Sequence, residues 1–185
     1  MADIDQVVVQ SLIAGEDRAY EAVVDMLYES VYRFALRLCG DSATAADVTQ
    51  ETFLAVWENI GSFKGKSRFT TWVFGIAYRQ FLRIHEKRTA ENTALGKWQD
   101  PRPSEPQGPP WRVDESLWIR DVVAGLPDIY RHVVLLVHVH GLNYREAAQV
   151  LGVPLGTVKS RMNSAYVLLR SRLEESDELV CSAVR

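Results

Sequence analysis

The sequence "GLNYREAAQVLGVPLGTVKSRM" (residues 141–162) decides the fold of the C-terminal part of this chain. Asn143 can cap a helix, and the glutamate three residues later completes a pair like that of a capping box. Ala148, Gly152 and Val158 follow at spacings of four and six residues. In a helix-turn-helix a small alanine lets two helices cross closely, a glycine turns the chain and a valine anchors the second helix. The spacing therefore predicts a helix-turn-helix.

The second helix of this unit separates apolar from polar side chains. Its apolar positions can pack inward: Leu155, Val158, Met162, Ala165 and Leu169. Its remaining surfaces carry Thr157, Lys159, Ser160, Arg161 and Asn163. These residue types donate to phosphates and reach base edges in the major groove, where arginine suits guanine and asparagine suits adenine. The pattern favours DNA contacts over the alternatives, a solvated helix or a helix-turn-helix that binds no DNA.

Charge alternates along the chain in blocks that the net charge of −3 conceals. Residues 1–58 carry a balance of −8, residues 59–90 of +6, residues 91–128 of −3, residues 129–173 of +5 and residues 174–185 of −3. Basic blocks of this size often contact polyanions, although a solvated helix face is an equally good interpretation of charge alone.

Helical periodicity dominates both ends of the chain, and no stretch alternates as a strand does. We expect helices over residues 5–16 and 18–39, a third between an Asp41 or Ser42 cap and Gly61, and a fourth over residues 67–88. Residues 91–113 hold five of the seven prolines and predict a flexible linker. Beyond the linker come four helical segments, which begin near Glu115 and are separated by glycine or proline.

Other features bear on where the protein works. The opening residues "MADIDQ" are acidic where a signal peptide is basic, and the longest aliphatic run, residues 133–137, is too short to cross a bilayer. Cys39 and Cys181 form neither a disulfide framework nor a metal motif. We therefore expect no membrane insertion, two reduced thiols and a cytoplasmic location.

The polar residues of the sequence do not form the motifs that are typical of an enzyme. His132, His138 and His140 could suggest a metal site, but positions 138 and 140 point to different faces of a helix and no carboxylate lies at a ligand spacing. The sequence has no nucleophile motif and no phosphate-binding glycine loop. We expect no enzymatic activity, no metal and no cofactor.

The stretch quoted first resembles the promoter-reading domain of bacterial RNA polymerase sigma factors of the extracytoplasmic-function (ECF) type, group 4 of the sigma-70 superfamily. The motif "GVPLGTVKSR" (residues 152–161) carries the resemblance. It implies that the minus-thirty-five promoter element is read by Thr157, Lys159, Ser160, Arg161 and Asn163. The family usually continues with more basic residues, where this sequence has Asn163, Ser164 and Tyr166.

The segment "DVTQETFLAVWENI" (residues 47–60) resembles the polymerase-binding helix of the same family. One face of the predicted helix holds Asp47, Gln50, Glu51, Leu54 and Glu58, and the opposite face holds Thr49, Phe53, Val56 and Ile60. The second face can pack the domain, whereas the first, without the resemblance, would be a solvated surface. The resemblance implies that the first face docks on the clamp helices of the largest polymerase subunit, while the flap of the second largest subunit is a further contact.

The segment "FKGKSRFTTWVFGIAYRQFLRIHEKR" (residues 63–88) resembles the family segment that melts and holds the minus-ten element. Phe69, Val73, Ile76 and Ala77 suit the core. The implied DNA contacts are Phe63, Lys64, Lys66, Ser67, Arg68, Trp72, Arg79 and Arg83, with the loop from Phe63 to Ser67 receiving a flipped base. Single-stranded DNA needs such cations for its backbone and a flat ring for its bases. Trp72 taken alone is better interpreted as a core tryptophan. Gly75 and Tyr78 stand where relatives often carry basic residues, and Arg79 where they often carry asparagine.

Together these patterns predict an all-α protein of two small helical domains joined by a Pro-rich flexible linker. The predicted parts are a sigma region 2-like domain (1–90), the linker (91–113), a sigma region 4-like helix-turn-helix domain (114–175) and an acidic tail (176–185). The resemblance implies a sigma factor that binds core RNA polymerase and promoter DNA and is controlled by an anti-sigma factor. The alternative is a stand-alone helix-turn-helix regulator, which would leave "DVTQETF" and the arginine–tryptophan face without a role.

Overall fold

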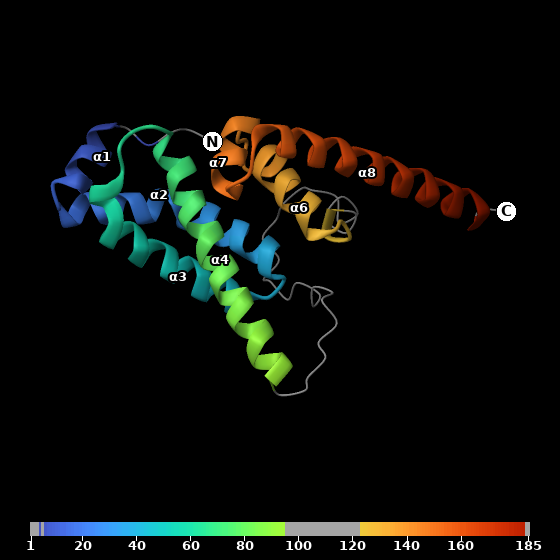
Figure 1. Cartoon of the computed structure of the whole chain (residues 1–185), viewed down its shortest axis with the longest axis horizontal. Helices are drawn as coiled ribbons and strands as arrows, with labels where there is room; N and C mark the ends of the chain where they lie inside the picture. The colour runs from blue at the N-terminus through green and yellow to red at the C-terminus, as the bar shows by residue number, and fades with distance from the viewer. Residues whose placement is uncertain (1–3, 5, 95–122, 184–185) are drawn as a thin grey trace. The chain divides into compact units, whose positions relative to one another are not determined.

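The structure is a computed structural model that describes Ile4 and residues 6–94 and 123–183, with side chains for residues 6–91 and 123–172. The described residues form helices and no strand, which confirms the all-α prediction, and the chain divides into an N-terminal and a C-terminal compact unit (Figure 1). Most of the predicted linker, residues 95–113, and the start of the predicted C-terminal domain, residues 114–122, lie outside the described part. No helix in that part combines the length and hydropathy that a membrane span requires.

The N-terminal unit consists of α1 (Gln6–Ile13), α2 (Asp17–Cys39), α3 (Ser42–Asn59), the 3₁₀ turn η1 (Ile60–Ser62) and α4 (Phe69–Ala94). Helix α2 packs against α1, α3 and α4, and α3 also packs against α4. Its centre is apolar: Val31 of α2, Val56 of α3 and Val73 of α4 are fully buried. Phe34 and Phe74 meet there edge to face, with ring centroids 5.2 Å apart.

Local sequence explains the ends of α2 and α3. Gly40 terminates α2 in the left-handed conformation (φ 77°), where glycine carries no Cβ penalty. Asp41 is the N-cap of α3, and its side chain accepts a hydrogen bond from the Thr44 backbone N–H at 2.8 Å. Of the two caps that the sequence left open, the structure selects the aspartate.

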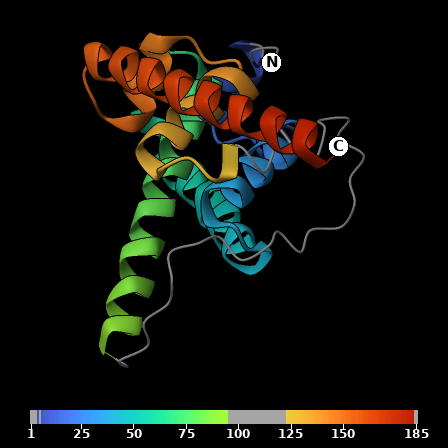
Figure 2. The same ribbon diagram turned by 90° about the vertical axis from the view of Figure 1, so that its right-hand side faces the viewer.

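Helix α4 is longer than the sequence predicted. It ends at Ala94 rather than near Arg88, so residue 90, the predicted domain boundary, lies inside the helix. The added turns contain no glycine or proline, and Lys87 and Glu91 form an i, i+4 ion pair at 4.0 Å. Figure 2 shows the last turns of α4 running beyond the other helices of its unit.

The C-terminal unit contains α6 (Asp128–Val134), η2 (Leu135–Val139), α7 (Tyr144–Leu151) and α8 (Leu155–Ala183). The segment predicted as one regular helix before Gly141 changes to a π-helix at η2, where the backbone N–H of His140 donates to the carbonyl of Leu135 at 3.0 Å. Helix α8 packs against α6 and continues to Ala183, so the predicted acidic tail is helical over most of its length.

The predicted helix-turn-helix is formed by α7 and α8. Asn143 Oδ1 accepts from the N–H of Glu146, and Glu146 Oε2 accepts from the N–H of Asn143 at 2.8 Å, which completes the capping box. After α7, Gly152 turns the chain at φ 66°, and the N–H of Val153 donates to the carbonyl of Ala148 at 3.1 Å. Val158 and Met162 of α8 are fully buried, as the predicted apolar stripe requires.

Candidate functional site

Helix α3 presents the exposed face that its sequence pattern predicted. Asp47, Gln50, Leu54 and Glu58 are exposed and Glu51 is half-buried. The opposite face holds Thr49, Phe53 and Val56 in the core and Ile60 half-buried. Buried Thr49 satisfies its hydroxyl by donating to the carbonyl of Ala45 at 2.7 Å. The acidic face is therefore not used to pack this unit.

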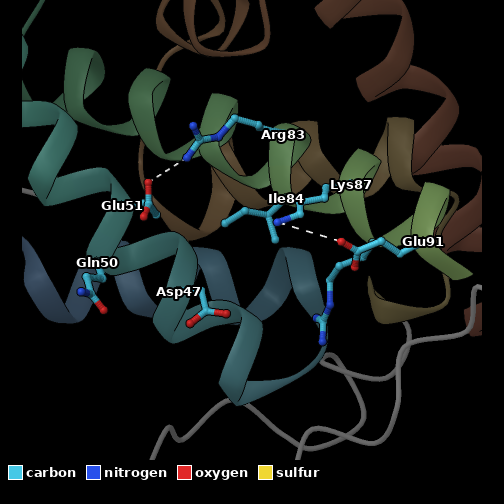
Figure 3. Close-up of a pocket in the computed structure, with 8 residues that line it drawn as sticks. Asp47, Gln50, Glu51, Arg83, Ile84, Lys87 and Glu91 are labelled. Carbon is cyan, nitrogen blue, oxygen red and sulfur yellow. Dashed lines mark hydrogen bonds and ion pairs between the residues drawn. The ribbon is translucent and has the colours of Figure 1, made fainter.

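This face forms one wall of a groove of about 520 Å³ between α3 and α4 (Figure 3). Asp47, Gln50 and Glu51 lie on the α3 wall. The α4 wall is made by Arg83, Ile84, Lys87, Arg88 and Glu91, of which only Arg83 was among the predicted site residues. Ile84, Lys87 and Arg88 lie in the segment that resembles the minus-ten region but were not assigned a contact there, and Glu91 lies in the turns that make α4 longer than predicted.

Two ion pairs link α4 to α3 and to its N-cap residue beside this groove. Arg83 Nη2 lies 2.7 Å from Glu51 Oε2, and Arg88 Nη1 lies 3.3 Å from Asp41 Oδ2. The sequence assigned Arg83 to promoter DNA and Glu51 to the polymerase, and the structure joins the two side chains directly.

An aromatic cluster lies at the start of α4. The ring centroid of Phe63 is 5.4 Å from that of Phe69 and 5.4 Å from that of Trp72, while Phe69 and Trp72 are 5.7 Å apart. Phe69 is buried, and Phe63 and Trp72 are half-buried. Trp72 therefore combines both interpretations of the sequence, because it packs on the core aromatic Phe69 and keeps part of its ring at the surface.

Cations surround this cluster unevenly. Lys64 and Lys66 are exposed on the loop that precedes α4, where Gly65 adopts the left-handed conformation (φ 66°). Arg79 is exposed and lies about two turns beyond Trp72 on α4. Arg83 lies eleven residues beyond Trp72, roughly 16 Å along the helix axis, and bonds to Glu51. The predicted minus-ten set is thus a cluster around Phe63 and Trp72 with Arg83 set apart from it.

The first turns of α8 present the predicted minus-thirty-five set at the surface. Lys159, Ser160 and Asn163 are exposed, and Thr157 and Arg161 are half-buried. Among the described residues, neither Lys159 nor Arg161 forms an ion pair, so both cations are available to an anionic partner.

A hydrogen bond that the sequence did not predict lies further along α8. His138 Nε2 of η2 and Tyr166 Oη of α8 are 2.7 Å apart. Tyr166 thus occupies a position where the family usually carries a basic residue, and it bonds within its own unit.

Comparison with known proteins identifies the family. The chain matches Sigma-70 region 2 over residues 23–91 and Sigma-70 region 4 over residues 116–169. It is 33% identical over 173 residues to the ECF RNA polymerase sigma factor SigL of Mycobacterium tuberculosis, a match that covers 88% of this chain and 96% of SigL. The chain belongs to the ECF RNA polymerase sigma factors.

Two further proteins extend this similarity. The sigma factor is 28% identical over 172 residues to the ECF RNA polymerase sigma factor SigW of Bacillus subtilis, with 87% of this chain and 92% of SigW covered. Its fold is similar to that of the sigma factor RpoE of Bartonella quintana, solved with the anti-sigma factor NepR, at a TM-score of 0.74 and 24% identity over 84% of this chain and 96% of RpoE.

Membership of this family decides between the functions that the sequence left open. A sigma factor binds core RNA polymerase and promoter DNA and directs the initiation of transcription, and it is not an enzyme. A stand-alone helix-turn-helix regulator would leave the match to region 2 unexplained.

Cys39 is the last residue of α2, and Asp41, Asp47 and Arg88 are its charged neighbours. Burial, together with the smaller effect of the nearby Asp41 carboxylate, raises the pKa of Cys39 to about 12. The thiol therefore stays protonated at neutral pH and is a poor nucleophile or metal ligand. Among the described side chains, no three histidine, cysteine or acidic residues gather as metal ligands.

Proposed function

We propose that the exposed face of α3 is the surface through which this sigma factor binds core RNA polymerase. The observation that carries the proposal is the division of α3 into a buried apolar face and an exposed face with Asp47, Glu51 and Glu58. Exposed carboxylates that are not needed for packing suit a basic partner surface, which we take to be the clamp helices of the largest subunit. Gln50 and Leu54 complete this docking face.

The loop before α4 and the aromatic cluster form the proposed minus-ten surface. Phe63 and Trp72 offer partly exposed rings on which bases can stack, and Lys64 and Lys66 lie beside them for the phosphates. Ser67, Arg68, Arg79 and Arg83 complete the proposed set. A flipped base would enter between the loop and the rings.

The first turns of α8 form the proposed minus-thirty-five surface. Thr157, Lys159, Ser160, Arg161 and Asn163 are all at least partly exposed there. Arg161 suits bidentate contact with guanine, and Lys159 suits a phosphate.

We assign the region 2-like domain to residues 1–94, which adds the last turn of α4 to the predicted 1–90. The region 4-like domain is assigned to residues 114–175. Its proposed polymerase contact is the flap of the second largest subunit.

We further propose that the protein works in the cytoplasm, where its polymerase is, and that an anti-sigma factor controls it. The solved relative of similar fold was captured with an anti-sigma factor, which supports this form of control. An anti-sigma factor that covers the α3 face would compete with the polymerase.

The test is transcription in vitro from fragmented genomic DNA of the source organism, with its core polymerase alone and with the purified full-length protein added. Sequencing of the transcript 5′ ends should reveal start sites that depend on the protein and share two upstream elements. Start sites identical to those of core polymerase alone would refute the proposed promoter surfaces.

A further inference from the structure

The ion pair between Glu51 and Arg83 joins a side chain proposed for the polymerase to a side chain proposed for DNA. Their atoms lie 2.7 Å apart, and the side chains keep 44% and 65% of their surfaces exposed (Figure 3). Both partners therefore remain within reach of outside molecules. While the pair is closed, the Arg83 guanidinium is neutralised by its own domain.

The second ion pair between these helices is built differently. Asp41 pairs with Arg88 at 3.3 Å, but it also caps α3 by accepting from the backbone N–H and the hydroxyl of Thr44. An outside cation that drew Asp41 away would break the cap of α3. Glu51 has no such second role among the described contacts, so only its pair can open without disturbing a helix end.

Asp47 provides the contrast within the docking face. It lies one turn before Glu51 on the same wall of the groove, and it forms no ion pair within the described part of the chain. The two carboxylates offer the polymerase similar charge, but only Glu51 must give up an internal partner to bind it.

We infer that Glu51 exchanges Arg83 for a basic residue of the polymerase, and that this exchange releases Arg83 for the promoter strand. The inference rests on the proposed function, because it takes the docking face and the DNA role of Arg83 from there. Polymerase binding and DNA binding are then linked, and by reciprocity each promotes the other. Free sigma factor keeps one DNA-binding cation occupied until polymerase engages Glu51.

The test compares two variants that each remove one carboxylate from the face, Glu51→Gln and Asp47→Asn. Free full-length protein is titrated with a fluorescein-labelled single-stranded oligodeoxynucleotide of mixed sequence, and binding is followed by anisotropy. Both variants lose one negative charge, so any general gain in affinity is shared. Glu51→Gln should bind more tightly than Asp47→Asn by about two- to five-fold, the range that an exposed ion pair supports.

Arg83→Gln supplies the second half of the cycle. In the Arg83→Gln background the difference between Glu51→Gln and Asp47→Asn should vanish, because the released cation is absent. Equal affinities of the two single variants, or a difference that persists without Arg83, would overturn the inference.

Binding to core polymerase separates this inference from the proposed docking face. Arg83→Gln should bind core polymerase as tightly as the unaltered protein or more tightly, because Glu51 no longer needs to be released. Weaker binding would mean that Arg83 orients Glu51 for the polymerase, which overturns the exchange and leaves the docking face intact. If Asp47→Asn and Glu51→Gln both bind core polymerase like the unaltered protein, the docking face itself is refuted, and with it the trigger for the exchange.

Discussion

Two arginines near the end of α4 and two cations in the first turns of α8 differ in what already neutralises them. Arg83 pairs with Glu51 of α3, and Arg88 pairs with Asp41, the N-cap of α3. Lys159 and Arg161 on α8 form no ion pair with any described residue. A phosphate can therefore bind Lys159 and Arg161 directly, whereas Arg83 must first leave Glu51.

The composition of a basic block in the sequence does not reveal how much of its charge is free to bind an outside anion. The block at residues 59–90 has a balance of +6 and the block at residues 129–173 of +5, so the two look alike in composition. Their surroundings differ because the first block lies against the most acidic part of the chain. We expect Lys159 and Arg161 to contribute DNA affinity at once and Arg83 to contribute it when the polymerase binds.

The largest expected effect comes from reversing the charge of the acidic face of α3. Asp47→Lys together with Glu51→Lys should abolish binding to core polymerase, because like charges across the docking surface cost several kcal/mol. Co-purification with core polymerase measures this, and circular dichroism should show unchanged helical content because both side chains lie outside the core.

The matched control is Glu21→Lys with Asp25→Lys, an exposed i, i+4 pair on α2 that makes the same change of charge. The control should still co-purify. Retention of polymerase by the Asp47/Glu51 variant would remove the acidic face of α3 from the mechanism.

The next largest effect is expected from removing Arg161, a cation of α8 that forms no ion pair with the described residues. Arg161→Ala should weaken binding of the polymerase holoenzyme to the minus-thirty-five element by about 1–3 kcal/mol and relax its preference at one base pair. Titration against a set of single-base promoter variants measures both quantities. Arg18→Ala, which removes an exposed arginine from α2, should change neither. Equal losses on every sequence would make Arg161 a phosphate contact.

A smaller effect tests what holds α7 in the helix-turn-helix. Asn143→Ala removes the cap of α7, whose Oδ1 accepts from two backbone N–H groups, and should destabilise this unit by about 1 kcal/mol. Hydrogen exchange of the α7 amides should accelerate about five-fold, while the amides of α3 keep their rates. Unchanged exchange in α7 would show that packing alone fixes the helix-turn-helix.

The smallest expected effect is the contribution of the Glu51–Arg83 pair to the free energy of unfolding. A double-mutant cycle with Glu51→Gln and Arg83→Gln should give a coupling energy of about 0.2–1 kcal/mol for unfolding of the N-terminal unit, because the pair is exposed. The coupling should shrink in about 1 M salt, where the screening length falls to about 3 Å. A coupling well above this range would mean a pair too strong for the polymerase to open.

Much of the fold could be predicted from the sequence because its determinants are local. The capping box at Asn143, the glycine turn at Gly152 and the apolar face of α3 depend on residues within one or two turns, and the structure confirms all three. The length of α4 could have been predicted more closely from the absence of helix breakers before Gly96.

The ion pairs could not be predicted in this way. Glu51 and Arg83 are 32 residues apart, and only the packing of α3 against α4 brings them together. Trp72 was also ambiguous, because its ring packs on Phe63, which lies at the start of the loop before α4 and whose position the sequence does not reveal. The π-helix at η2 falls in the apolar sequence LLVHV, which carries no signal that distinguishes a π-helix from an α-helix.

We expect this sigma factor to read promoters only when it is bound to core polymerase. Its net charge of −3 does not favour approach to DNA, and Arg83 is occupied in the free protein. The direct measurement is a fluorescence titration of labelled promoter duplex and scrambled duplex at matched salt, with the free protein and with its complex with core polymerase. We expect weak, unselective binding by the free protein and selective binding by the complex. Nanomolar, sequence-selective binding by the free protein would contradict it.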